Sequence, residues 1–205
     1  MAHLSAADPV MARLVGESGP VALTPTGDYF FTLLEAMASQ QLSSKAADTI
    51  VRRILALFPG KASPAPEDVL ALPDQAFRDA GLSWSKVSYL KDLAAHVASG
   101  RLPLDHIAQM PDEEAIAALV AVKGIGRWTA EMFLIFSMAR PDVLAVDDYG
   151  LRAAMMRLYN LPELPKPAAM REVAEPWRPY RSYASLYLWR SRDGSAKVQD
   201  TQIWG

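Results

Sequence analysis

Residues 119–130 read LVAVKGIGRWTA, and residues 146–149 read VDDY. The first segment predicts the end of one helix, a tight turn around Gly124 and Gly126, and the start of a second helix. Glycine lets the backbone adopt sharp turn angles and approach a phosphate closely, and the free N–H groups at a helix start form an anion site. The second segment places two carboxylates at the end of the second helix. Together they predict a phosphate-binding hairpin with an acid held close by.

The composition indicates one large domain or two small lobes with a full hydrophobic core. The chain has 205 residues, of which 51% are hydrophobic, and it contains no cysteine. The lack of cysteine excludes disulfides and thiolate ligands for zinc or an iron–sulfur cluster. No segment reaches about 18 uninterrupted apolar residues, and no signal peptide is visible. We therefore expect a cytoplasmic protein.

The net charge of −2 argues against a protein held on nucleic acid mainly by a basic surface. Proteins that bind DNA chiefly through counterion release are expected to be basic. Any binding of DNA by this chain must therefore depend on local geometry.

Apolar residues recur at helical spacing along nearly the whole chain, and no segment alternates as a strand does. Asp8, Asp28 and Asp112 stand where helices should be capped, and Gly60 and Gly100 stand where helices should end. The sequence predicts an all-α fold. The expected helices lie near residues 9–15, 29–38, 44–58, 67–71, 74–80, 84–99, 113–122, 126–138, 149–159, 167–175 and 180–191.

Four motifs in order resemble one protein family. GIGRWTA at 124–130 and VDDY at 146–149 are similar to the helix-hairpin-helix DNA glycosylases. PWRPYRSYA at 176–184 and Trp189 resemble the 3-methyladenine DNA glycosylase II branch, and SQQLS at 39–43 also fits. The similarity covers nearly the whole chain, in the short form without the β-domain that some members carry at the N-terminus.

The resemblance implies a single helix-hairpin-helix glycosylase domain over residues 1–205, with two helical lobes and a cleft between them. The central lobe is expected at about 28–140. The second lobe should contain the N-terminal helix and about 141–193.

The resemblance also implies that the hairpin binds a phosphate beside a damaged base that is flipped out of the duplex. Isolated charges on a turn are usually only solvated, which is the alternative for Lys123 and Arg127. No cofactor is expected for catalysis, but Na⁺ or K⁺ is implied at the carbonyls of Val120, Val122 and Ile125. The DNA-binding candidates of the hairpin are Lys123, Gly124, Ile125, Gly126, Arg127 and Thr129.

Residue 128 decides the expected mechanism. A lysine at this position of the family would form a Schiff base with the sugar and permit strand cleavage. An indole cannot act as that nucleophile, so Trp128 implies that water attacks the sugar and leaves an abasic site in an unbroken strand. The alternative for Trp128 is ordinary core packing.

Asp147 and Asp148 compete for the catalytic role. Cleavage of the glycosidic bond builds positive charge on the sugar, which a carboxylate stabilises. The alkylated-base branch aligns its catalytic aspartate with Asp148, whereas the spacing in other branches aligns Asp147. We choose Asp148 and expect the other aspartate to cap the helix that starts at Tyr149; in the alternative, both are only caps.

An alkylated purine is often cationic, and electron-rich rings attract such a base. Trp128 and Trp189 match pocket positions of the family. Met132 lies one turn after Trp128, where the branch can carry an aromatic residue. Trp84 and Tyr29 either line the same cleft or pack in the core.

The loop at 39–43 is expected to enter the duplex. Gln41 matches the position that fills the gap left by the flipped base, and Gln40 is the neighbouring candidate. Such wedges are often apolar, but a glutamine can hydrogen-bond the orphaned base. The alternative is a solvated loop residue.

These features favour a monofunctional glycosylase that removes alkylated, preferably cationic, purines from double-stranded DNA. The alternatives are a related glycosylase for uracil or an oxidised purine, and a DNA-binding module without activity. We expect a monomer that has no membrane partner and that associates with the bacterial nucleoid when bound to DNA.

The tryptophan at 128 leads to a direct test. Incubation with alkylated DNA should release free base and leave a strand that breaks only after alkali or heat. Borohydride should trap no covalent complex, because no Schiff base forms. A trapped adduct would contradict the hydrolytic mechanism.

Overall fold

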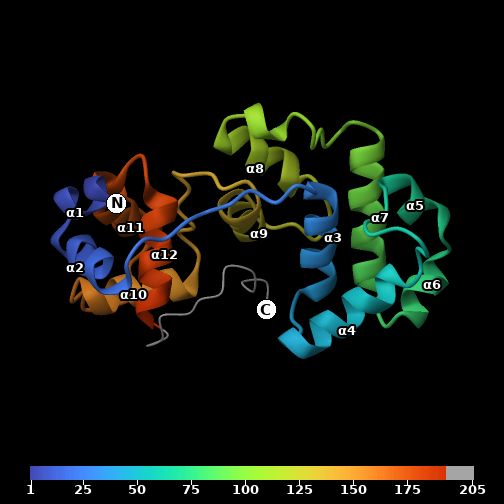
Figure 1. Ribbon diagram of the computed structural model, residues 1–205, viewed down its shortest axis with the longest axis horizontal. Coiled ribbons are helices and arrows are strands. Elements are labelled where there is room, and N and C mark those ends of the chain that lie inside the picture. Colours follow the sequence, from blue (N-terminus) through green and yellow to red (C-terminus); the bar gives the residue numbers. More distant parts are fainter. Residues whose placement is uncertain (193–205) are drawn as a thin grey trace. The chain divides into compact units, whose positions relative to one another are not determined.

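A computed structural model describes residues 1–192, and all regular secondary structure among them is helical, which confirms the all-α prediction (Figure 1). These residues divide into two compact units, one formed by residues 26–130 and the other by residues 1–25 with 131–192. The division falls within a continuous helix, α9 (Arg127–Met132). No helix in the described part of the chain is long and apolar enough to cross a membrane.

The 26–130 unit is built around one long helix, α7 (Trp84–Ala98). This helix packs against α3, α5 and α6 (Figure 1). Ser83 caps it by accepting the Lys86 amide at 3.3 Å, and its apolar side chains at Val87, Leu90 and Ala94 are buried. The other helices of the unit are α3 (Tyr29–Ser39), α4 (Ser44–Leu55), α5 (Pro66–Ala71), α6 (Asp74–Asp79), α8 (Asp112–Val120) and a short 3₁₀ turn (Ile107–Gln109).

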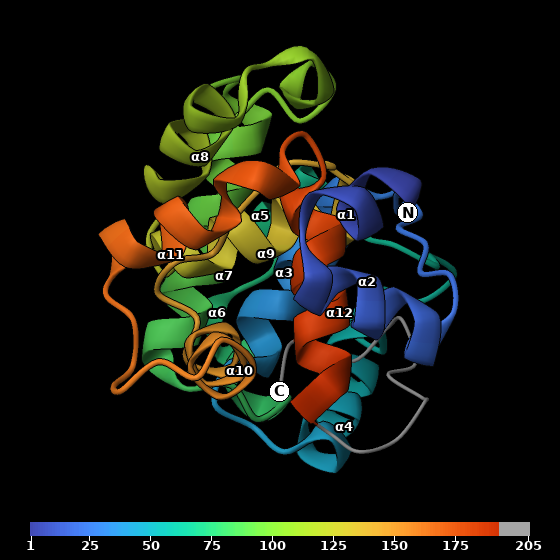
Figure 2. The ribbon, with the colours of Figure 1, turned by 90° about the vertical axis from the view of Figure 1, so that its left-hand side faces the viewer.

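The other unit combines both ends of the described chain. Helix α12 (Arg181–Arg192) packs against α2 and α10 (Figure 2). Trp177 and Tyr187 are the largest fully buried side chains of its core. Its remaining elements are α1 (Ala2–Ala7), α2 (Pro9–Ser18), a π-helical turn (Phe133–Ser137), α10 (Tyr149–Leu158), α11 (Pro167–Ala174) and a 3₁₀ turn (Glu175–Trp177).

Asp8 joins three distant segments of this unit. As predicted, it caps α2, and one carboxylate oxygen accepts the amides of Val10 at 2.7 Å and Met11 at 3.2 Å. Its other oxygen accepts the Tyr159 hydroxyl at 2.6 Å and the Trp177 indole N–H at 2.8 Å. Burial and the neighbouring carboxylate raise the pKa of Tyr159 far above its ordinary value. The buried Asp8 therefore satisfies four donors.

Two expected helix boundaries are corrected, and one helix was not predicted. The N-cap of α8 is Pro111, and Asp112 is the first helical residue, where its charge still favours the helix dipole. Helix α4 ends at Leu55 rather than near Phe58, because Leu57 and Phe58 turn more tightly, donating to carbonyls three residues back at 3.0 Å. The N-terminal helix α1 was not predicted, since only Leu4 of its residues is buried.

Asp8 should contribute strongly to stability. Asp8→Ala removes a helix cap and leaves the buried Trp177 N–H without its acceptor, so we expect a loss of about 2–4 kcal/mol in the free energy of unfolding. Asp28 caps α3 at an exposed site, and Asp28→Ala should cost only about 1 kcal/mol. Urea unfolding followed by circular dichroism measures both, and equal losses would contradict the role given to Asp8.

Candidate functional site

The hairpin between α8 and α9 depends on Gly124. This residue has a φ of +86°, and a Cβ there would lie 2.5 Å from Cδ2 of Tyr89. Neither the backbone angle nor the space admits a side chain. Gly126 differs, since a Cβ at that position would meet no atom within 4 Å.

The amides of the hairpin differ in whether they have a partner. The Lys123 amide donates to Oδ2 of Asp92 at 2.9 Å, and the Ile125 amide donates to the Val122 carbonyl at 3.2 Å. Within residues 1–192, neither the Gly124 amide nor the Gly126 amide donates a hydrogen bond to another group of the protein. Unsatisfied amides at the start of a helix are suited to an anion.

One face of α7 supports both this hairpin and the loop after α3. Lys86, Tyr89 and Asp92 are spaced by three residues, so they follow one another along the helix. Lys86 Nζ donates to the carbonyls of Ala38 and Gln40, each at 2.7 Å. Burial lowers the pKa of Lys86. The motifs contain none of these three residues, and only their helical spacing was visible in the sequence.

Gln40 and Gln41 have different environments. The Gln40 side chain is partly buried, and its Nε2 donates to the Gly124 carbonyl at 3.1 Å. Gln41 is exposed and has a φ of +61°, a left-handed conformation that is uncommon outside glycine. The loop that the sequence predicts to enter the duplex follows Ser39, the last residue of α3, and is called the wedge loop below (residues 40–43). It has one glutamine bonded to the hairpin and one that is exposed.

The charged side chains of the hairpin are also unequal. Arg127 makes a two-pronged ion pair with Glu113, with N–O distances of 3.0 and 2.6 Å. The Lys123 side chain is 68% exposed, and its Nζ lies 4.0 Å from Oδ1 of Asp92. Ile125 and Thr129 are buried. Lys123 is thus the more accessible of the two cations.

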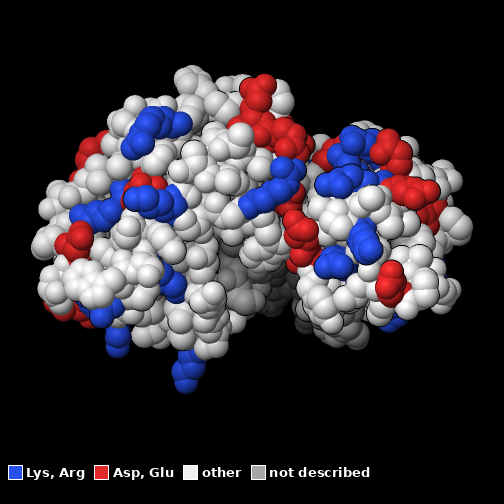
Figure 3. All heavy atoms as spheres, turned by 180° about the vertical axis from the view of Figure 1, so that it is seen from behind, with Lys and Arg blue, Asp and Glu red and all other residues white. Residues whose placement is uncertain are grey.

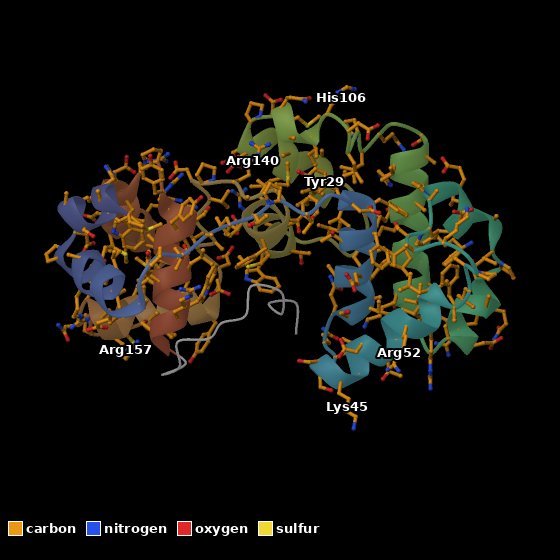
Figure 4. The ribbon with its side chains drawn as sticks, in the orientation of Figure 1. Tyr29, Lys45, Arg52, His106, Arg140 and Arg157 are labelled. Carbon is orange, nitrogen blue, oxygen red and sulfur yellow. The ribbon has the colours of Figure 1, made fainter. Side chains whose placement is uncertain are left out.

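The aromatic candidates of the 26–130 unit are partly exposed. Trp128, the second residue of α9, is 38% exposed. Trp84 is 58% exposed at the start of α7, and the Arg78 guanidinium lies 5.0 Å from its ring centre. Tyr29 is the first residue of α3 (Figure 4). The remaining candidates, Asp147, Asp148, Met132 and Trp189, belong to the other unit.

Asp148 is held by two donors. Its Oδ1 accepts the Leu151 amide at 2.6 Å and the Trp189 indole N–H at 2.8 Å. Asp148 therefore caps α10, which corrects the expectation that the non-catalytic aspartate would do so. Asp147 is exposed. The N-terminus of α10 places partial positive charge beside the Asp148 carboxylate.

The Trp189 ring also lies close to the ring of Phe136. The two ring centroids are 5.6 Å apart, and the ring planes are inclined by 36°. Phe136 belongs to the π-helical turn after α9, a feature often found at functional sites. Met132 is only 1% exposed, so its side chain is part of the packed interior.

Acidic and basic side chains are mixed on the face shown in Figure 3, where no large basic patch appears. Two cations absent from the motifs follow the wedge loop on α4. Lys45 and Arg52 are exposed and point away from the helix (Figure 4).

This chain is similar to known proteins over most of its length. DNA-3-methyladenine glycosylase 1 of Schizosaccharomyces pombe is 36% identical over 193 residues, covering 92% of this chain and 85% of that protein. A structure of 3-methyladenine DNA glycosylase from S. pombe in complex with abasic DNA has a TM-score of 0.79 at 34% identity, with 97% and 98% of the two chains covered. The crystal structure of DNA-3-methyladenine glycosidase from Bacillus halodurans has a TM-score of 0.87 at 36% identity, covering 94% of this chain and 88% of that one.

The family model for the HhH-GPD superfamily of base excision DNA repair proteins matches residues 34–179. This range contains the wedge loop, the glycine hairpin and the aspartate pair. The chain therefore belongs to the HhH-GPD superfamily of base excision DNA repair proteins.

Proposed function

We propose that this protein is a DNA glycosylase that excises alkylated purines such as 3-methyladenine and leaves an abasic site for base excision repair. Relatives aligned over almost their whole length carry the name 3-methyladenine glycosylase. The observation that carries the mechanism is the Asp148 carboxylate, held between the start of α10 and the Trp189 indole. Action on chromosomal DNA would place the protein in the cytoplasm, at the nucleoid in a bacterial cell.

Asp148 is suited to stabilising charge. As the bond between base and sugar breaks, positive charge develops on the sugar, and a fixed carboxylate lowers the energy of that state. The two donors to Oδ1 hold the carboxylate in place. This environment supports an electrostatic role for the carboxylate together with orientation of the attacking water.

A cationic purine is the preferred substrate in this mechanism. Its positive charge already weakens the bond to the sugar, so departure of the base needs no dedicated acid. Aromatic rings attract such a base by cation–π contact and stacking. In the unit that contains Asp148, Trp189 is the ring that lies against this carboxylate. Trp128 cannot form a Schiff base, which supports hydrolysis without strand cleavage.

The hairpin is the proposed phosphate site. The Gly124 and Gly126 amides are the donors available to a phosphate oxygen. Lys123 on the hairpin and Lys45 after the wedge loop add positive charge near the same strand. Gln41 is the proposed wedge, because its exposed position leaves the side-chain carboxamide accessible to the orphaned base.

A monovalent cation is the group that the family implies at the hairpin. No cluster of three His, Asp or Glu side chains within residues 1–192 could hold a metal ion. The carbonyls of Val120, Val122 and Ile125 are the proposed ligands of a weakly held Na⁺ or K⁺, and the C-terminal end of α8 carries partial negative charge that would attract it. Val122 already accepts the Ile125 amide, and its oxygen keeps a second lone pair. Such an ion would supply positive charge for phosphate binding.

The two hairpin glycines should respond differently to substitution. Gly124→Ala places a methyl group against the Tyr89 ring, and the distorted hairpin should bind abasic-site and undamaged duplexes more weakly, because phosphate contacts carry no sequence information. Gly126→Ala has open space and should retain most of its affinity. Fluorescence anisotropy measures both affinities. Unchanged binding by Gly124→Ala would contradict the phosphate site.

Asp148→Asn should abolish base release while the fold and DNA binding remain largely intact. The substitution keeps the shape and removes the charge, and electrostatic groups of this kind contribute about 100-fold or more to a rate. Asp147→Asn is the matched control and should retain activity. Single-turnover release of 3-methyladenine from methylated DNA measures both. Full activity in Asp148→Asn with loss in Asp147→Asn would assign catalysis to the other aspartate.

A further inference from the structure

Lys86 occupies an unusual position for a lysine in a DNA-binding protein. Its ammonium group turns inward, donating to the carbonyls of Ala38 and Gln40 at 2.7 Å. The last carbonyls of a helix have no partner within the helix. Lys86 therefore supplies hydrogen-bond donors to carbonyls at the C-terminal end of α3. Because its hydrogen bonds are directed to the protein backbone, Lys86 is not arranged as a phosphate contact.

These bonds hold the backbone just where it changes direction. Gln40 follows the last residue of α3, and Gln41 takes the left-handed conformation that starts the wedge loop. Residues other than glycine rarely adopt this backbone conformation unless the surrounding structure enforces it. Lys86 and a hydrogen bond of 3.1 Å from the Leu42 amide to the Ser39 carbonyl hold the chain on either side of Gln41.

The same helix face holds the hairpin. Tyr89 fills the space above Gly124, and Asp92 accepts the Lys123 amide at 2.9 Å. Gln40 connects the wedge loop directly to the hairpin, because its Nε2 donates to the Gly124 carbonyl. The wedge loop and the phosphate-binding hairpin therefore share one rigid support within the 26–130 unit.

We propose that Lys86 is a positioning residue that fixes the wedge loop in register with the hairpin, so that Gln41 enters the duplex when the hairpin binds the backbone. This inference rests on the proposed glycosylase function. It assigns a role in distorting DNA to a side chain that contacts neither the base nor the phosphate.

The chain offers a matched control on the same helix. Lys91 Nζ donates to the Leu70 carbonyl at 3.1 Å and to the Leu72 carbonyl, thereby closing the end of α5 as Lys86 closes the end of α3. Lys86→Met and Lys91→Met both remove hydrogen bonds to two backbone carbonyls and keep an unbranched apolar side chain. Lys91→Met also removes an ion pair with Asp74, at an N–O distance of 3.7 Å. Only the hydrogen bonds of Lys86 lie at the wedge loop. Both variants should unfold at reduced urea concentrations, so a loss of stability alone cannot produce a difference confined to Lys86→Met.

Wedge insertion can be measured without catalysis. The probe is a duplex with 2-aminopurine opposite a tetrahydrofuran abasic-site analogue, whose fluorescence changes when its stacking is disturbed. The change on saturation should be much smaller for Lys86→Met than for the wild type, and unaltered for Lys91→Met. The rate of 3-methyladenine release should fall between about 10- and 100-fold for Lys86→Met, as expected when a group is misplaced by about 1 Å.

A double variant decides whether Lys86 acts through Gln41. In a Gln41→Ala background, Lys86→Met should change the fluorescence and the rate by less than about twofold, because residues acting through one another are not additive. Multiplicative effects, or an equal loss in Lys91→Met, would overturn the proposal. Absence of base release by the wild type would count against the proposed function, and the fluorescence comparison would still decide the role of Lys86.

Discussion

The contact between the Tyr89 ring and Gly124 is the constraint on which the hairpin depends. The ring occupies the space of a Cβ, so the backbone of the hairpin approaches α7 as closely as a glycine permits. That approach brings the Lys123 amide to Asp92 and the Gly124 carbonyl to Gln40. The neighbouring amides of Lys123 and Ile125 are paired within the protein, whereas those of Gly124 and Gly126 have no partner among residues 1–192.

The sequence predicts local features well. Asp8 and Asp28 stand directly before apolar helical patterns, and each caps the helix expected of it. The glycine hairpin was visible because glycine at positive φ has few substitutes. The hydrogen bonds of the second Asp8 oxygen could not be predicted from local sequence, because its partners Tyr159 and Trp177 lie more than 150 residues away along the chain.

The candidate site shows the same limit. The motif resemblance singled out Asp148 and Trp189, but nothing local indicates that the indole N–H of one donates to the carboxylate of the other, 41 residues away. Lys86 and Asp92 belong to none of the motifs and are charged residues of an amphipathic helix. Their partners are backbone groups, which carry no signature of residue type, so the sequence gives no sign of these bonds. The catalytic assignment itself remains a prediction.

The course of the chain through the two units has a consequence for biosynthesis. The 26–130 unit is continuous in sequence, so all of its residues are available once residue 130 has left the ribosome. The first 25 residues belong to the other unit, and Asp8 meets Trp177 only near the end of synthesis. Because domains tend to fold as units during translation, the N-terminal helices emerge first but must wait for their partners, while the hairpin and wedge loop can already assemble.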